Sequence, residues 1–94
     1  MRNYELVCVI QPDLDEAAFN GVLDRVKGWV TDSGGVVEKV DLWGRRRLAY
    51  IIRKQREGLF VLLNISLKPA AIADLERNLR YQEPIMRHML SLVG

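Results

Sequence analysis

Cysteine and histidine are almost absent from this chain of 94 residues, which contains one of each, Cys8 and His88. An internal disulfide is therefore impossible, and no spacing of ligands gathers a zinc, calcium or haem site. A lone cysteine in an apolar strand is usually a small core residue. Strand periodicity turns His88 towards the expected core, which favours a structural role over a catalytic one. We expect no metal, no other cofactor and no enzymatic activity.

Long apolar runs and glycine-rich loops are also missing. The longest apolar run, Leu59–Leu63, is far too short to cross a bilayer, and Met1–Glu5 lacks the basic-then-apolar layout of a signal peptide. The glycine pair Gly34–Gly35 follows an expected helix instead of preceding one, so it does not form a phosphate-binding loop. We expect a protein of the cytoplasm or of an organelle interior, with no membrane partner and no small-molecule substrate.

The length allows one modest core, so we expect a single domain over residues 1–94. Hydrophobic residues make up 49% of the chain and charged residues 28%, which is an ordinary globular balance. The net charge of +2 is small. Binding to nucleic acid would therefore depend on how the charges are placed and not on how many there are.

Apolar periodicity predicts six elements. The expected strands cover residues 3–10, 36–53, 59–67 and 85–93. The first, third and fourth show period-two alternation, and the second is longer than an average strand. Asp13 with Glu16 resembles a capping box that starts the first helix, and Asp15 is the competing cap. The second helix opens at Lys68–Pro69. Residues 54–58 form the expected hairpin loop between the second and third strands.

The order strand, helix, strand, strand, helix, strand is that of two interlocked split βαβ units. We therefore predict an α+β ferredoxin-like sandwich, with a four-stranded antiparallel sheet in the order 4-1-3-2 and both helices on one face. Gly44 marks a bulge or bend, beyond which the second strand is expected to project as an arm. The other sheet face is apolar at its centre, so a partner is expected to cover part of it. The residues expected on that face are Glu5, Val7, Val9, Phe60, Leu62, Asn64, Arg87 and Met89.

Six of the fourteen Lys and Arg residues lie between Arg45 and Arg56, with no acidic residue among them. Five of the six are Arg, whose planar guanidinium binds phosphate in two-point contacts. Protection of an exposed strand edge needs only one or two charges, so it is the weaker explanation. For the hairpin tip, a simply solvated loop is an equally good explanation. The expected phosphate contacts are Arg45, Arg46, Arg47, Arg53, Lys54 and Arg56.

Two other ferredoxin-like classes fit the sequence less well. Acylphosphatases hold phosphate with an arginine in the loop after the first strand, where this chain has Gln11–Asp13. RNA-recognition motifs stack bases on aromatic residues of the sheet. Alignment on Gly58 puts Leu59 and Val61 at the stacking positions, and both point towards the expected core. The aromatic residues Trp43 and Tyr50 flank the cations instead, either as core residues or as anchors at a protein interface.

Three segments together resemble the bacterial small-subunit ribosomal protein S6 family over essentially the whole chain. They are Met1-Arg2-Asn3-Tyr4-Glu5, Gly34-Gly35 before Val-Glu-Lys-Val at 37–40, and Gly44-x-Arg46-Arg47-Leu48-Ala49-Tyr50. The resemblance implies a structural protein of the ribosome, bacterial or organellar, that binds the central domain of small-subunit rRNA as a heterodimer with ribosomal protein S18. A regulatory or RNA-recognition-type module outside the ribosome is the alternative.

The resemblance also implies particular contact residues. Residues 43–50 would lie against the partner protein, and the arginines at 45–47 would serve both partner and RNA. The RNA contacts implied by position are Arg2 and Arg87, on adjacent strands of the open face, with Tyr4 and Met89 near them. The implied partner contacts are Trp43, Leu48 and Tyr50.

Overall fold

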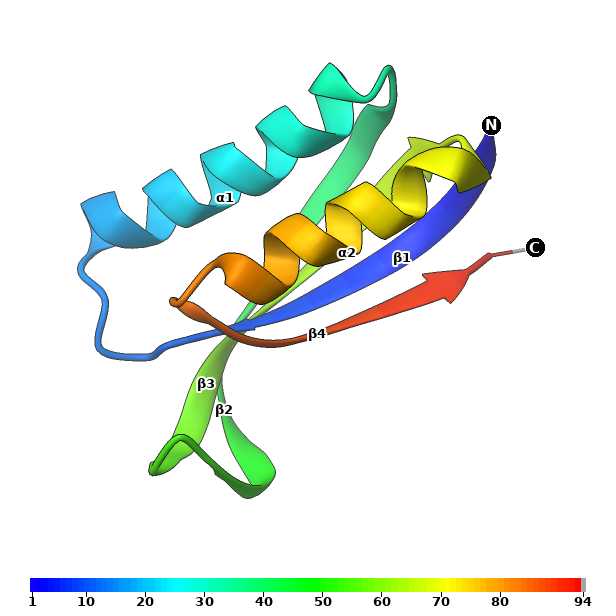
Figure 1. Ribbon diagram of the computed structural model, residues 1–94. Coiled ribbons are helices and arrows are strands. Elements are labelled where there is room, and N and C mark those ends of the chain that lie inside the picture. The colour runs from blue at the N-terminus through cyan, green and yellow to red at the C-terminus, as the bar shows by residue number, and fades with distance from the viewer. Residues whose placement is uncertain (94) are drawn as a thin grey trace.

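The computed structural model describes residues 1–93, which form a sheet with two helices on one of its faces (Figure 1). The strands pair antiparallel in the order β2-β3-β1-β4, so the predicted ferredoxin-like fold and strand order are confirmed. Within these residues, neither helix combines the length and the apolar character needed to span a bilayer. The elements are β1 Arg2–Ile10, α1 Glu16–Asp32, β2 Val36–Ile52, β3 Gln55–Leu67, the 3-10 turn η1 Pro69–Ala71, α2 Ile72–Tyr81 and β4 Ile85–Leu92.

Capping hydrogen bonds and backbone conformation determine where the helices start and end. The carboxylate of Asp15, and not that of Asp13, caps α1, because Asp15 Oδ1 accepts a hydrogen bond from the backbone N–H of Ala18 at 2.7 Å. Gly34 ends the helix with a φ of 82°, a conformation that costs glycine no steric energy. Pro69 starts the second helical segment, but as the short turn η1, and α2 begins only at Ile72.

The core lies between the sheet and the helices. Alternate residues of β1 and β3 point into it, as period-two alternation predicts, and they meet the apolar stripes of α1 and α2. The fully buried large side chains of this core include Leu6, Ile10, Val22, Val26, Val30, Val61, Leu63, Ile65, Leu67, Leu75 and Leu79.

Cys8 is buried in this core, and desolvation raises the pKa of its thiol from 9.0 to about 12. Above pH 9 the unfolded chain loses the thiol proton while the folded protein keeps it. The free energy of unfolding should therefore fall by about 1.4 kcal/mol per pH unit between pH 9 and 12 because of this group. Urea unfolding across this range, compared with Cys8→Ala, isolates the thiol, and equal pH slopes for the two proteins would contradict the assignment.

The hairpin between β2 and β3 differs from its prediction. The turn is only two residues, Arg53 and Lys54, with φ values of 50° and 65°, and the residues expected as a loop up to Gly58 belong to β3. Two consecutive positive φ values are the pattern of tight hairpin turns, which usually contain Asn-Gly. Arg-Lys is an uncommon choice for this turn, so a two-residue turn could not be recognised from these residues.

The second strand is interrupted by bulges, as Gly44 indicated. The register shifts between Leu42 and Gly44, where Gly44 has a φ of 81°. A larger shift follows: between the pairs Arg47–Glu57 and Ile52–Gln55, β2 advances five residues while β3 advances two. The extra residues bend the hairpin end, residues 43–56, which we term the hairpin arm.

The pairing of β1 with β4 also contains a bulge. The register shifts between Val9 and Ile10, so that Ile85 pairs with Ile10 and enters the helix-side core. Met86 is buried but lies outside that core, against the place where a Cβ on Gly58 would sit. Period-two alternation predicts that Met86 shares the core face with His88, and this prediction is wrong because of the bulge.

Candidate nucleic-acid interface

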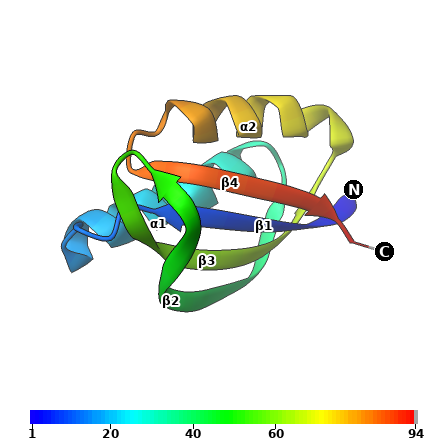
Figure 2. The ribbon, with the colours of Figure 1, turned by 90° about the horizontal axis from the view of Figure 1, so that it is seen from below.

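The hairpin arm does not project freely from the sheet. It bends across the face opposite the helices, and in Figure 2 the end of β2 crosses in front of β3 and β1 towards the start of β4. A groove of about 170 Å³ remains between the arm and the sheet. Its lining residues are Val9, Leu48, Ala49, Tyr50, Ile52, Phe60, Arg87 and Met89. The chain itself therefore covers part of the apolar face for which a partner was expected, and Val9 is only 2% exposed.

Two contacts attach the arm to the far edge of the sheet. Arg53, in the hairpin turn, donates a hydrogen bond from Nη1 to the backbone carbonyl oxygen of Glu83, just before β4. Arg87 on β4 donates from Nη1 to the phenol oxygen of Tyr50, and its Cζ lies 5.7 Å from the centroid of the Tyr50 ring. The arm thus crosses the sheet from edge to edge.

Most cations of the arm have no acidic partner. Arg45 is the exception, since its guanidinium lies 3.4 Å from the carboxylate of Glu57 and donates to the carbonyl oxygen of Pro12 at 3.2 Å. Arg46 stacks over the Trp43 ring at 5.1 Å from the centroid, which leaves its charge uncompensated. Within residues 1–93, the side chains that are exposed and form no ion pair with a carboxylate include Arg46, Arg47, Arg53, Lys54, Arg56 and Arg87.

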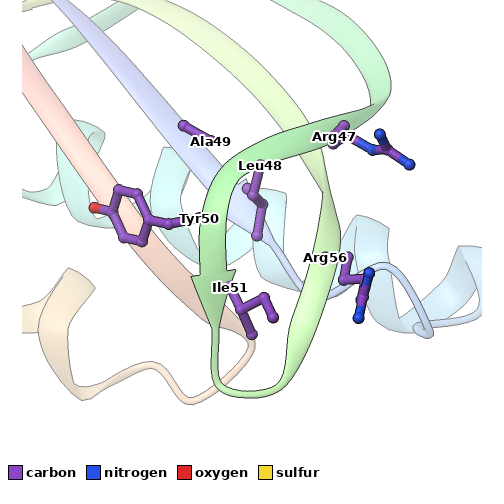
Figure 3. A pocket seen from close by; sticks show the side chains of 6 residues that line it. All are labelled: Arg47, Leu48, Ala49, Tyr50, Ile51 and Arg56. Atoms are coloured by element: carbon purple, nitrogen blue, oxygen red, sulfur yellow. The ribbon is translucent and has the colours of Figure 1, made fainter.

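Two of these arginines flank a hollow on the arm. Arg47 and Arg56 extend to one side of the hairpin, while Tyr50 points the other way, towards β4 (Figure 3). Leu48 and Ile51 lie between the two strands of the arm, and the hollow measures about 200 Å³. The hollow therefore presents apolar side chains between two guanidinium groups, which are well suited to binding phosphate.

The amino-terminal residues proposed as RNA contacts lie elsewhere. Tyr4 belongs to the helix-side core and is 9% exposed, so its ring has little surface to offer. Arg2 pairs with buried Leu67 and so starts on the helix side, since directly paired residues share a face. Arg87 pairs with Val9, seven positions along β1 from Arg2, which corresponds to about 23 Å. The expectation that Arg2 and Arg87 are adjacent on the open face is therefore wrong, whereas Met89 is on that face beside Arg87.

The three residues expected to bind a partner protein lie together with the cations. Trp43 is 40% exposed and Tyr50 is 58% exposed, so neither is a core residue. Leu48 is half-buried and borders both the groove under the arm and the hollow on it. The question that the sequence left open, core or surface, is thus answered in favour of the surface for both aromatic residues.

His88 has a structural partner. Its Nε2 lies 3.3 Å from Oε1 of Glu76, so the ring links β4 to α2. Across residues 1–93, no three acidic, histidine or cysteine side chains come together in a way that could hold a metal ion.

Sequence reasoning missed the two contacts that attach the arm to the β4 edge of the sheet, Arg53 to Glu83 and Arg87 to Tyr50. Nothing in the composition pairs Tyr50 with Arg87, which are 37 residues apart. Gly58 indicates close approach of another side chain, but that side chain belongs to β1 and to neither of these two contacts. A Cβ at this position would come within 2.5 Å of Val9 Cγ1.

The fold and the basic arm define the class: a small α+β ferredoxin-like protein that presents exposed, unpaired cations on a bent hairpin. The family profile of ribosomal protein S6 matches residues 3–91. Small ribosomal subunit protein bS6 of Moorella thermoacetica is 43% identical over 91 residues, covering 97% of this chain and 93% of that protein. The corresponding protein of Desulforamulus reducens is 41% identical over 94 residues, covering 100% and 99%.

A solved structure agrees with these matches. The crystal structure of 30S ribosomal protein S6 from Thermotoga maritima superposes with a TM-score of 0.92 at 27% identity, covering 98% of this chain and 87% of that one. The chain belongs to the ribosomal protein S6 family, so it is a structural, non-enzymatic protein of the small ribosomal subunit. The predicted family and the absence of enzymatic function are confirmed.

Proposed function

We propose that this chain acts as one domain that binds the central domain of small-subunit rRNA together with ribosomal protein S18, in a cytoplasmic ribosome. The observation that carries the proposal is the set of guanidinium groups on and beside the hairpin arm that no carboxylate neutralises, Arg46, Arg47, Arg53, Arg56 and Arg87. Uncompensated, exposed guanidinium groups favour an anionic polymer over a neutral partner.

The arginines contact phosphates and fix the position of the protein without reading base sequence. Base stacking on the sheet does not contribute, because Val61 is fully buried and Leu59 packs against the helix-side core. These are the positions at which an RNA-recognition motif would present its aromatic rings. Specificity therefore comes from the shape of the folded RNA and from the surface that the two proteins form together.

Ribosomal protein S18 binds the apolar and aromatic part of the arm. Trp43 and Tyr50 are large amphipathic side chains on an exposed segment, which is the residue type that anchors protein interfaces. They lie next to the arginines in sequence and in space. A protein bound there would extend the RNA-binding surface instead of competing with it.

Salt dependence tests the RNA contact. The triple variant Arg46→Gln, Arg47→Gln and Arg56→Gln should reduce the slope of log affinity against log salt by about 2 units, because each lost phosphate contact removes about 0.7 to 0.9. The measurement is filter binding of the heterodimer with S18 to the central-domain rRNA fragment, from low to physiological salt.

A matched variant controls for net charge. Arg25, Arg77 and Arg80 are exposed arginines of α1 and α2, on the helix side. Their triple replacement by Gln removes the same number of positive charges from the protein. This control variant should leave the slope of log affinity against log salt nearly unchanged. Equal slope losses in the two triple variants would show a general charge effect and would overturn the assignment to the arm.

A further inference from the structure

Arg87 is held by a residue from another part of the chain. Its strand, β4, lies at the edge of the sheet, and the side chain is exposed with no carboxylate partner. Tyr50 of the hairpin arm supplies both of its polar contacts, a phenol oxygen that accepts from Nη1 and an aromatic ring 5.7 Å from Cζ. An arginine of this kind would otherwise sample many rotamers, so the two contacts restrict it.

The position of Tyr50 depends on the bent hairpin. Between Arg47 and Ile52, β2 has residues 48–51 opposite the single residue Arg56 of β3, and Tyr50 is one of these four. Its side chain points towards β4 (Figure 3). The hydrogen bond from Arg53 to the carbonyl of Glu83 attaches the turn beside the start of β4. Tyr50 therefore reaches Arg87 because the arm is attached at its tip, and movement of the arm would move Tyr50 away from Arg87.

The guanidinium keeps its capacity to bind an anion while Tyr50 holds it. Arginine has five N–H donors in a planar fork, and the phenol of Tyr50 uses a donor on Nη1. Its neighbours on the open face are the apolar side chains of Val9 and Met89, which lower the local competition from water without supplying a negative charge. The remaining donors can make the two-point contact that phosphate favours.

We infer that Tyr50 is a positioning residue for Arg87: it holds the guanidinium in the orientation that binds a phosphate oxygen, and it thereby links the protein-binding arm to the RNA-binding strand. This inference rests on the proposed function, because it assigns the anion at Arg87 to an RNA phosphate. A coupling of this kind is reciprocal, so a protein that fixes the arm should strengthen phosphate binding at Arg87, and the RNA should strengthen protein binding at the arm.

A double-mutant cycle tests the inference. Tyr50→Phe removes the phenol and keeps the ring, and Tyr50→Leu removes both contacts. With S18 at saturating concentration, binding of the central-domain rRNA fragment should weaken about threefold for Tyr50→Phe and about tenfold for Tyr50→Leu. In the Arg87→Gln background neither change should have a further effect, because the group being positioned is gone.

A spectroscopic readout separates positioning from a general structural role. In the free protein, the NMR signals of the Arg87 Nε and Nη groups should report slow rotation about the Nε–Cζ bond, and Tyr50→Phe should speed this rotation. Tyr81, 79% exposed at the end of α2, provides the matched control, since Tyr81→Phe should change neither the rotation nor the RNA affinity.

The outcomes are distinguishable. If the wild-type heterodimer fails to bind the rRNA fragment, the proposed function and the inference both fail. If it binds with the expected salt dependence but Tyr50→Phe has the same effect in both Arg87 backgrounds, or none in either, the proposed function stands and the inference is overturned. Unaltered Arg87 rotation in Tyr50→Phe would overturn it as well.

Discussion

Replacement of Gly35 with alanine should lower the free energy of unfolding by about 3 kcal/mol. A Cβ at this position would lie 2.5 Å from Leu67 Cδ2, 2.5 Å from the carbonyl oxygen of Ser66 and 3.0 Å from that of Val30. Two of these atoms belong to the backbone of β3 and α1, which cannot turn aside as the end of a flexible side chain can. Overpacking of this kind usually costs about 1 to 3 kcal/mol, and the backbone contacts put Gly35 at the upper end.

Gly28 supplies the matched control. It lies inside α1, and a Cβ there would meet no atom within 4 Å. Gly28→Ala should therefore stabilise the protein by about 1 kcal/mol, since alanine has the higher helix propensity. Urea unfolding of the two variants measures both effects. A midpoint for Gly35→Ala at or above that of the wild type would contradict close packing of the connection between α1 and β2 around Gly35.

The sheet with its two helices could be predicted because the strands alternate cleanly. In β1, Leu6, Cys8 and Ile10 are buried against the helices, as period two requires. The same alternation puts Tyr4 on this face, whereas the family resemblance implies that Tyr4 contacts RNA. The structure agrees with alternation, because burial along a strand is set by its neighbours in the sheet and not by its neighbours in the sequence.

The path of the hairpin arm could not be predicted. Gly44 correctly signalled a bulge, but the irregularity between Arg47 and Ile52, like the one between Val37 and Lys39, contains no glycine or proline. The turn at Arg53–Lys54 adopts left-handed conformations that neither residue prefers. Contacts with Glu83 and β4 hold the arm in place, and such long-range contacts leave no periodic trace in the sequence.

The candidate site could therefore be predicted only in part: the sequence shows its cations but not their partners. Charge placement alone identified the arginines between Arg45 and Arg56 as exposed cations, and exposure confirms this for all of them. Their partners could not be read from the sequence, because an acidic residue such as Glu57 neutralises Arg45 only through the register of the two strands. Arg47 is directly paired with Glu57 in this register, but the Glu57 carboxylate contacts Arg45 instead, so Arg47 and Arg56 are left without an acidic partner.

The double variant Trp43→Ala with Tyr50→Ala should weaken binding of ribosomal protein S18 by at least about 100-fold. Truncation of a central aromatic anchor typically costs 2 kcal/mol or more, and two such anchors lie on this arm. Neither side chain belongs to the helix-side core, so the free energy of unfolding should change by less than about 1 kcal/mol. Calorimetry with S18 in the absence of RNA measures the affinity, and urea unfolding measures the stability.

Tyr81→Ala is the control for this variant, because Tyr81 is a more exposed aromatic residue on the helix side, remote in sequence from the arm. Its truncation should leave S18 affinity within about twofold of the wild type, since an aromatic ring outside the interface buries nothing on binding. A double variant that folds normally and binds S18 as tightly as the wild type would show that the two rings serve the arm itself. Trp43 would then act by stacking on Arg46, and Tyr50 by holding Arg87, with the partner protein bound elsewhere.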